Sequence, residues 1–402
     1  MTDTDLALNT QATALAAMLE SARTPHPLAV YRGVFTPQVL DAPDTEIAAL
    51  AHGAAVHDLG WLRRVAVRGE DRFRWLSGMV TNTVNDLFPN TGAWNLVLNS
   101  QGRIQGDLTV WREAEEKSPQ RRNPVPDAAK SGDRLLGTPF AGESGLDLEI
   151  AADQFDKLMA HLNRFIIMDD VELVPLGVEQ VGEAGSETAI GLTGPQADAV
   201  LGRVGLPTLT LPMSGARVEW NGLDLKIMRG YGALAPHYQF WTPIAGLTKL
   251  WSCLRTAGAT PTGCASLEAF RIAEGIPAYG IDINERDLPQ ETSQLRALHF
   301  NKGCYLGQEI VERIHSRGSV RRHLRQMELQ GPLPKPGTEL TLQDGTPAGH
   351  ITGAAELPLA SGLRLFALAM LRAEAEMSEQ PFNYATGSAS GTARILAAPP
   401  IL

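Results

Sequence analysis

Helical and strand patterns alternate along most of this chain, whereas from about Val320 onward only short strand patterns separated by turn residues remain. Short strands that follow one another in this way predict a small all-β module, because each strand buries its apolar face only against the others. The strands are expected at residues 324–329, 339–342, 348–351, 363–371 and 391–395. The order of the patterns therefore favours an α+β protein with a β-rich C-terminal module.

Two segments upstream have the strongest local signals. Residues 151–165 place Phe155, Leu158 and Leu162 on one face at helical spacing, which predicts an amphipathic helix. Residues 93–99 and 107–111 alternate around a Ser-Gln-Gly-Arg turn, which predicts a β-hairpin. Further strands are expected at 64–68, 170–174 and 223–227, and further helices within 1–22, 70–79, 195–204, 247–254 and 266–274.

A length of 402 residues predicts two to three domains at roughly 150 residues each. We expect a helical extension over residues 1–45 and an α+β portion made of residues 46–145 together with 240–320. A second α+β domain is expected over 146–239 and the β module, a small barrel, over 321–402. The polar, proline-bearing stretch 113–135 predicts a loop or inserted linker.

Charge and cysteine content exclude several classes of function. Lys plus Arg is 35 and Asp plus Glu is 45, so the net charge is −10, which disfavours DNA as a partner. No window approaches the roughly 20 apolar residues of a membrane span. Three cysteines without a C-x-x-C pair predict neither a disulfide framework nor a metal site. The N-terminus has no targeting pattern, so we expect a cytoplasmic protein without a membrane partner.

The most informative window is residues 301–310, NKGCYLGQEI. Gly303 and Gly307 flank Cys304 and predict a tight turn with an accessible backbone. Lys302 lies two residues before the thiol, and a nearby cation favours the reactive thiolate. The alternative is a cysteine that packs inertly beneath the turn.

Two further features each allow a structural and a functional interpretation. Basic residues gather between Arg313 and Arg325, either as a patch for an anionic ligand or as a solvated face. Arg271 lies one helical turn from Glu268 and Glu274, so it either forms an ordinary ion pair or is held ready for a ligand carboxylate.

Four polar or aromatic side chains are weaker candidates. Asp107 follows the hairpin turn and is either a pocket carboxylate or an ordinary strand residue. His237, Trp61 and Trp94 either line a pocket, where an indole stacks on a heteroaromatic ring, or pack in the core. The sequence carries no dinucleotide fingerprint, Walker A motif, zinc-protease motif or nucleophile elbow.

The window 302–309, KGCYLGQE, resembles the K-G-C-Y-x-G-Q-E motif of YgfZ-type folate-binding proteins, which are relatives of the glycine cleavage T-protein (aminomethyltransferase). Residues 271–280 resemble the R-I-x-x-G-x-P-x-x-G segment of this family. Residues 81–87, 102–108 and 194–197 resemble its T-N-D-V-x-x-L, G-R-x-x-x-D-L and G-P-x-A segments in the same order.

The resemblance implies a three-domain aminomethyltransferase-like ring with a small C-terminal β-barrel, folded around a site for tetrahydrofolate or a one-carbon derivative. It also implies iron–sulfur client or assembly proteins as partners. Cys304 and Lys302 are then the reactive pair. The residues expected to bind folate are Arg271, Gln239, Asp107, Trp61, Tyr305, Gln308 and Glu309.

Two departures from the T-protein pattern bear on activity. An acidic pair on the hairpin is reduced to Gly106-Asp107, and Gln239 stands where a glutamate faces the pterin. A glutamine still donates and accepts hydrogen bonds but holds no charge. We therefore expect an accessory protein of iron–sulfur cluster assembly or repair without turnover. The alternatives are a folate-dependent aminomethyl or one-carbon transferase and a folate-free scaffold.

Overall fold

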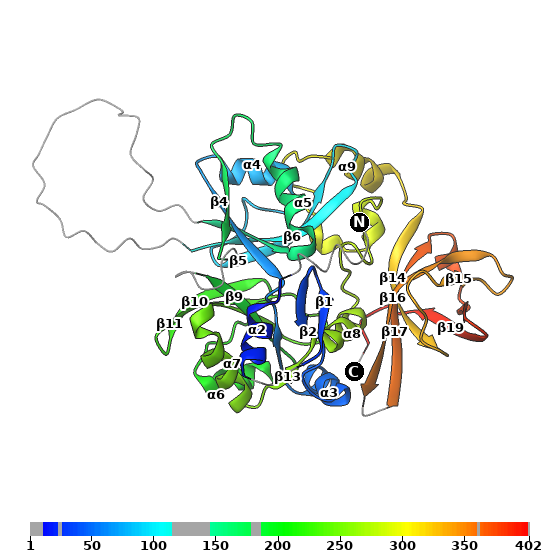
Figure 1. The fold of residues 1–402 in the computed structure, drawn as a ribbon. Helices are drawn as coiled ribbons and strands as arrows, with labels where there is room; N and C mark the ends of the chain where they lie inside the picture. Colours follow the sequence, from blue (N-terminus) through cyan, green and yellow to red (C-terminus); the bar gives the residue numbers. More distant parts are fainter. Residues whose placement is uncertain (1–10, 23–25, 115–144, 178–185, 360–361, 401–402) are drawn as a thin grey trace, which may run out of the picture.

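The computed structural model describes residues 11–22, 26–114, 145–177, 186–359 and 362–400. Figure 1 shows two lobes of mixed helix and sheet, with the C-terminal strands forming a third lobe beside them. Most of the predicted linker 113–135 lies outside the described residues. Among the residues described, no helix is long and apolar enough to cross a membrane.

An eleven-stranded sheet runs through the first two lobes. Its two halves are joined through the residue pair Ser214 with Thr91. The first half contains, in spatial order, β13 (Thr260–Thr262), β3 (Ala55–Asp58), β9 (Glu187–Thr193), β12 (His237–Pro243), β11 (Leu223–Arg229) and β10 (Ser214–Trp220). The second contains β5 (Thr91–Leu98), β6 (Ile104–Arg112), β7 (Leu146–Ala151), β4 (Leu62–Arg68) and β8 (Glu172–Leu176).

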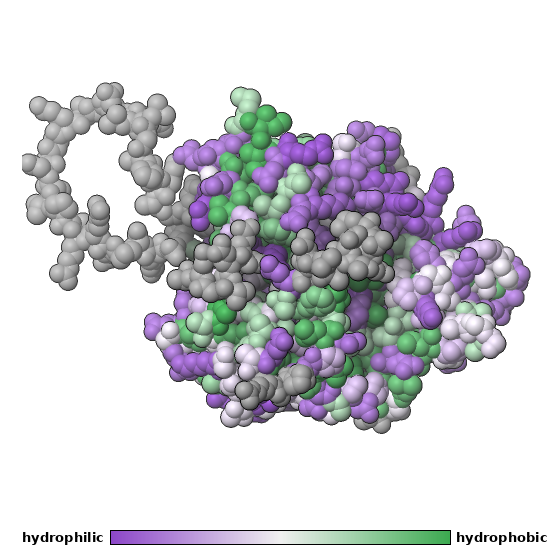
Figure 2. Space-filling view, in the orientation of Figure 1, coloured by the Kyte–Doolittle hydropathy of each residue, from purple (hydrophilic) through white to green (hydrophobic). Residues whose placement is uncertain are grey.

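Each half buries its apolar face beneath helices. The first half packs under α6 (Ala197–Val204) and α7 (Leu247–Thr256), with α2 (Ala14–Ser21) at its edge. The second half packs under α4 (Arg72–Met79) and α5 (Ala152–Asn163), the helix expected from the spacing of Phe155, Leu158 and Leu162. The loop after α5 exposes Ile167 and Met168, and Figure 2 shows a hydrophobic tip at this place.

A third apolar cluster joins the lobes. It contains α3 (Pro43–His52) and α8 (Cys264–Glu274), which pack against the barrel. The barrel is closed, as the sequence predicts, from β14 (Arg322–Gln330), β17 (Gly362–Arg372), β16 (Pro347–Leu359), β15 (Glu339–Thr341), β18 (Phe382–Thr386) and β19 (Ala389–Ile395). Remaining elements are the hairpin β1 (Leu28–Tyr31) and β2 (Val34–Pro37), and the 3-10 turns η1 (Ile244–Gly246), η2 (Pro289–Thr292), η3 (Leu295–Ala297) and η4 (Ala375–Met377).

The segment after the KGCY turn forms a helix, α9 (Gln308–Arg317), which was not among the helices predicted from the sequence. Gly307 takes the left-handed conformation (φ 81°), and a Cβ there would lie 2.6 Å from the Asn99 carbonyl oxygen, so only glycine fits. Val311 is fully buried and anchors the helix, and Ile310 and Ile314, one turn apart, are half-buried.

Candidate functional site

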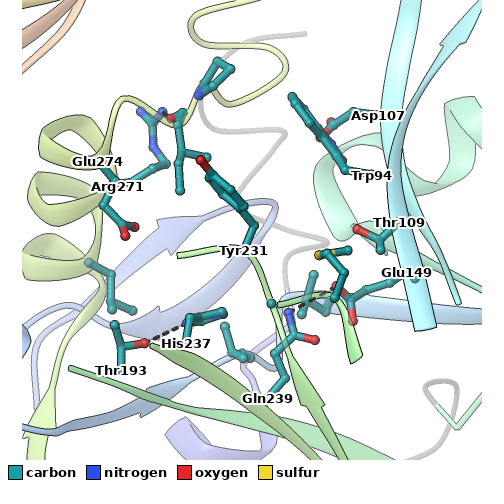
Figure 3. Close-up of a pocket in the computed structure, with 18 of the residues that line it drawn as sticks. Trp94, Asp107, Thr109, Glu149, Thr193, Tyr231, His237, Gln239, Arg271 and Glu274 are labelled. Atoms are coloured by element: carbon teal, nitrogen blue, oxygen red, sulfur yellow. Dashed lines mark hydrogen bonds between the residues drawn. The ribbon is translucent and has the colours of Figure 1, made fainter. Parts of the chain in front are cut away.

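A cavity of about 430 Å³ lies where the two halves of the sheet meet α8. Its walls come from β3, β9 and β12 on one side, from β5, β6 and β7 on the other, and from α8 and η3. Four of the residues expected to bind folate line it, namely Trp61, Asp107, Gln239 and Arg271. Figure 3 shows side chains from these separate elements pointing into one space around Tyr231.

A buried amide–carboxyl pair forms one end of the cavity (Figure 3). Gln239 Nε2 of β12 donates to Glu149 Oε1 of β7 at 3.3 Å, so the hydrogen bond joins the two halves of the sheet. Burial raises the pKa of Glu149 to about 7, which outweighs the opposing effects of Gln239, of two nearby cations and of Trp241. Glu149 Oε2 and Gln239 Oε1 are buried and have no hydrogen-bond partner among the described residues.

Buried nitrogen atoms on the cavity-lining residues are also unpartnered. The indole Nε1 atoms of Trp61 and Trp111 and the imidazole Nδ1 of His57 make no hydrogen bond within the part of the chain that the structure describes. Buried polar groups are ordinarily satisfied, because each unmet donor or acceptor costs roughly 1–3 kcal/mol. Donors and acceptors left open around one aromatic-walled cavity are typical of a site for a polar heteroaromatic ligand.

Asp107 is held rigidly in the wall. Its Oδ2 accepts from Trp94 Nε1 at 2.8 Å, and its Oδ1 accepts from Gln154 Nε2 at 2.8 Å. Gln154 Oε1 in turn accepts a hydrogen bond from the Asp107 backbone N–H at 3.0 Å. The carboxylate therefore orients the Trp94 indole at the cavity, and both of its oxygens are in use.

Two imidazoles share one hydroxyl at the floor of the cavity. Thr193 Oγ1 lies 2.9 Å from His57 Nε2 and 2.7 Å from His237 Nδ1. The rings are nearly parallel, with centroids 5.7 Å apart. Burial lowers the pKa of His57 to about 3 and that of His237 to about 4, so both rings are neutral at physiological pH.

Arg271 is fully engaged by the protein. Its Nε and Nη2 donate to the Glu268 carboxylate at 2.9 and 2.5 Å, and Nη1 donates to Asp282 Oδ2 at 2.7 Å and to the Ile276 carbonyl. Arg271 therefore forms an ion pair, one of the two possibilities that the sequence left open. Its partners are Glu268 and Asp282, and Glu274 is not among them. Glu274 accepts from the Leu234 backbone N–H, and burial raises its pKa to about 7.

The KGCY turn lies outside the cavity wall. Cys304 is exposed, and Lys302 Nζ donates to the carbonyl oxygens of Val80 and Asn82, both at 2.7 Å, which directs the amine into the protein. Burial lowers the pKa of Lys302 to about 8. Tyr305 is buried under the turn.

The two remaining residues of the motif belong to α9. Gln308 Oε1 accepts from the Tyr305 backbone N–H at 3.3 Å, and Glu309 pairs with Arg313 at 2.7 Å on the surface. None of the motif residues 302, 304, 305, 308 and 309 lines the cavity. Their assignment as catalytic or folate-binding residues remains a prediction.

The basic segment beyond α9 is largely paired. Arg322 contacts Asp287 at 2.6 Å and Glu291 at 3.2 Å. His323 and Arg325 both contact the Glu376 carboxylate, at 2.8 and 2.7 Å. These side chains contact carboxylates at the junction of the barrel with the rest of the chain.

Several residues of the cavity were not among the predicted site residues. Glu149 gave a usable signal, because a carboxylate within the apolar strand LDLEIA suggests a buried charge. His57 and Tyr231 gave none, since strand pairing and loop packing bring them to the site. Arg296 lies six residues before Lys302 in the short 3-10 turn η3, and only the tertiary structure shows that it reaches the cavity.

Comparison with known proteins agrees with this architecture. The GCVT N-terminal domain family matches residues 10–118. A chloroplastic protein of Arabidopsis thaliana named as a transferase is 24% identical over 78% of this chain and 64% of its own length. The aminomethyltransferase of Frankia alni is 22% identical over 78% and 77% of the two chains. A mitochondrial iron–sulfur cluster assembly factor homologue of Pyricularia oryzae is 26% identical over 65% and 54%.

The chain thus spans less than two thirds of the length of the first and third of these relatives. A solved structure, the glycine cleavage system aminomethyltransferase T of Bartonella henselae, aligns with a TM-score of 0.78 at 18% identity and covers 97% of this chain and 98% of that one. This likeness and the closed barrel confirm the expected aminomethyltransferase-like fold. The chain is thus similar over most of its length to aminomethyltransferases and, over a shorter part, to an iron–sulfur cluster assembly factor homologue, and it carries a match to the GCVT N-terminal domain.

Proposed function

We propose that this protein binds a reduced folate, tetrahydrofolate or a one-carbon derivative, in the 430 Å³ cavity and supports iron–sulfur cluster assembly or repair as an accessory protein. The observation that carries the folate proposal is the set of unpartnered polar atoms on buried cavity-lining residues, above all Glu149 Oε2 and Gln239 Oε1. The volume lies within the range of small-molecule sites.

The residues of the cavity fit a pterin. A pterin ring is flat and carries amide-like donors and acceptors along one edge. Gln239 carries a buried acceptor without a partner among the described residues, and Glu149, with its pKa near 7, accepts or donates according to its protonation. Trp94 and Tyr231 present aromatic faces to the same space. A bound tetrahydrofolate would supply a carrier for a one-carbon unit.

The iron–sulfur part of the proposal rests on the relative from Pyricularia oryzae and on Cys304. Cys304 is exposed, so its thiol is accessible to a client or assembly protein. A free thiol persists in a reducing compartment, and we place this role in the cytoplasm.

Two matched pairs of variants test the proposal. Gln239→Ala should weaken tetrahydrofolate binding about tenfold by anaerobic titration calorimetry, because one neutral hydrogen-bond pair is worth about 1 kcal/mol or more. Gln343→Ala, an exposed barrel residue of the same type, should bind normally. Absence of folate binding by the unchanged protein would leave only the scaffold alternative.

For the thiol, Cys304→Ser should fail to restore the activity of iron–sulfur enzymes in a deletion strain, with its folate affinity unchanged. Cys253→Ser, on α7, is the control and should restore that activity. Full complementation by Cys304→Ser contradicts a role for the thiol.

One observation favours the transferase alternative, namely that the hairpin carboxylate Asp107 lines the cavity. Steady formation of methylene-tetrahydrofolate from an aminomethyl donor, abolished in Asp107→Asn, would establish that activity. Binding without turnover would favour the accessory role.

A further inference from the structure

The cavity wall contains one unpaired cation among the described residues. Arg271, the other arginine of the wall, is neutralised by Glu268 and Asp282. Arg296 differs, because its guanidinium has no ion pair and no hydrogen bond to any described residue, and its Nε is buried. Desolvation of an uncompensated charge is costly, so such a group is usually completed by an anion.

Aromatic rings hold the Arg296 guanidinium in place. Its Cζ lies 3.7 Å from the centroid of the Tyr231 ring and 5.0 Å from that of Trp94. The Arg296 carbonyl oxygen accepts from Asn82 Nδ2 at 2.8 Å, which fixes the backbone. Stacking leaves the edge of a guanidinium free for bidentate bonds to a carboxylate.

Arg296 stands at the junction of two cavities. A second cavity of about 260 Å³ adjoins the first and shares Tyr231, Glu274 and Arg296 with it. Its other walls come from β14 and β17 of the barrel and from residues 396–399. The one other arginine of this second cavity, Arg325, is paired with Glu376 at 2.7 Å.

We propose that Arg296 is the anion-recognising residue of the site and binds a carboxylate on the ligand's tail where that tail passes from the first cavity toward the second. The inference rests on the proposed folate function, whose ligand carries two such carboxylates on its glutamate. It replaces Arg271 and the basic segment as the receptor for these groups. Glu274 does not oppose the contact at full charge, because burial raises its pKa to about 7.

The test compares tetrahydrofolate with its diamide, in which both carboxylates are neutral carboxamides of nearly the same size. The unchanged protein should bind tetrahydrofolate at least tenfold more tightly than the diamide, as expected for a charge-assisted contact. Arg296→Gln should lose about tenfold in tetrahydrofolate affinity and change diamide affinity by less than twofold. Arg296→Lys, which keeps the charge but not the fork, should lie between the two.

Controls separate this inference from the proposed function. Arg217→Gln, an exposed arginine on β10 that pairs with Asp224, should behave as the unchanged protein. Equal weakening of both ligands in Arg296→Gln, or unchanged binding of both, would overturn the inference while folate binding stands. Failure of the unchanged protein to bind either ligand would instead remove the proposed function itself.

Discussion

Replacement of Glu149 by glutamine should change how the stability of the protein depends on pH. The carboxyl group is 7% exposed, and burial raises its pKa from the ordinary 4.5 to about 7. Between these values the folded chain holds a proton that the unfolded chain releases. Glu149 therefore favours folding below about pH 4.5, and this contribution is lost as pH rises through about 7.

The size of the effect follows from the two pKa values. Because proton binding is linked to folding, ionisation of Glu149 lowers the free energy of unfolding by about 2–3 kcal/mol more at pH 8 than at pH 5. An amide does not ionise, so Glu149→Gln should avoid this loss. Between pH 5 and pH 8 its free energy of unfolding should rise by about 2–3 kcal/mol relative to that of the unchanged protein. It also keeps an oxygen to accept the hydrogen bond from Gln239.

Urea unfolding followed by tryptophan emission measures this difference. All seven tryptophans lie between Trp61 and Trp251, outside the barrel, so the signal reports the lobes that hold the cavity. Glu356→Gln, at an exposed barrel position, serves as the control and should leave the pH dependence unchanged. A stability difference between Glu149→Gln and the unchanged protein that stays constant from pH 5 to pH 8 would refute the reasoning.

Three other perturbations have defined outcomes. Gly191→Ala should lower both stability and ligand affinity, because its Cβ would lie 2.0 Å from His57 Cε1. Gly202→Ala on α6, where a Cβ meets open space, should raise the free energy of unfolding by about 0.5–1 kcal/mol, measured by urea unfolding. The folded chain keeps His57 and His237 neutral, so their contribution to the free energy of unfolding is present above about pH 6.5 and is lost as pH falls toward 4. His237→Gln should therefore lose less stability than the unchanged protein between pH 7 and pH 5. Phe366→Ala, at a fully buried barrel position, should cost about 3–5 kcal/mol, and a cost below 1 kcal/mol would contradict the packing.

Local patterns were sufficient for much of the fold. The hairpin β5–β6, the helix α5 and five of the six barrel strands follow from side-chain periodicity, because a half-buried strand or helix must alternate apolar and polar faces. β18 was missed, since its inward residues Phe382 and Tyr384 fall in a strand of only five residues. The division of the chain into domains at residues 145, 240 and 320 remains a prediction.

The site was predictable where a residue type carried its own chemistry and unpredictable where long-range pairing creates the environment. Gln239 was found through the family motif, but its partner Glu149 lies 90 residues away and meets it only because β12 and β7 face one another. Arg271 had the right charge for a ligand. Its donors are taken up partly by Asp282, and no pattern in the sequence predicted that Asp282 would lie beside Arg271. Conversely, Arg296 becomes a candidate only because no carboxylate among the described residues forms an ion pair or a hydrogen bond with its guanidinium.

The cavity and the KGCY turn occupy different places, yet one hydrogen-bonded path connects them. Lys302 Nζ donates to the Asn82 carbonyl oxygen at 2.7 Å, and Asn82, which lines the cavity, donates from Nδ2 to the Arg296 carbonyl oxygen at 2.8 Å. The lysine therefore braces the turn that carries Cys304 against the cavity wall, and its role beside the thiol stays a prediction. A part-buried ammonium bound by two carbonyl oxygens fastens the KGCY turn to the backbone of residues 80–82, and Asn82 of that segment lines the cavity.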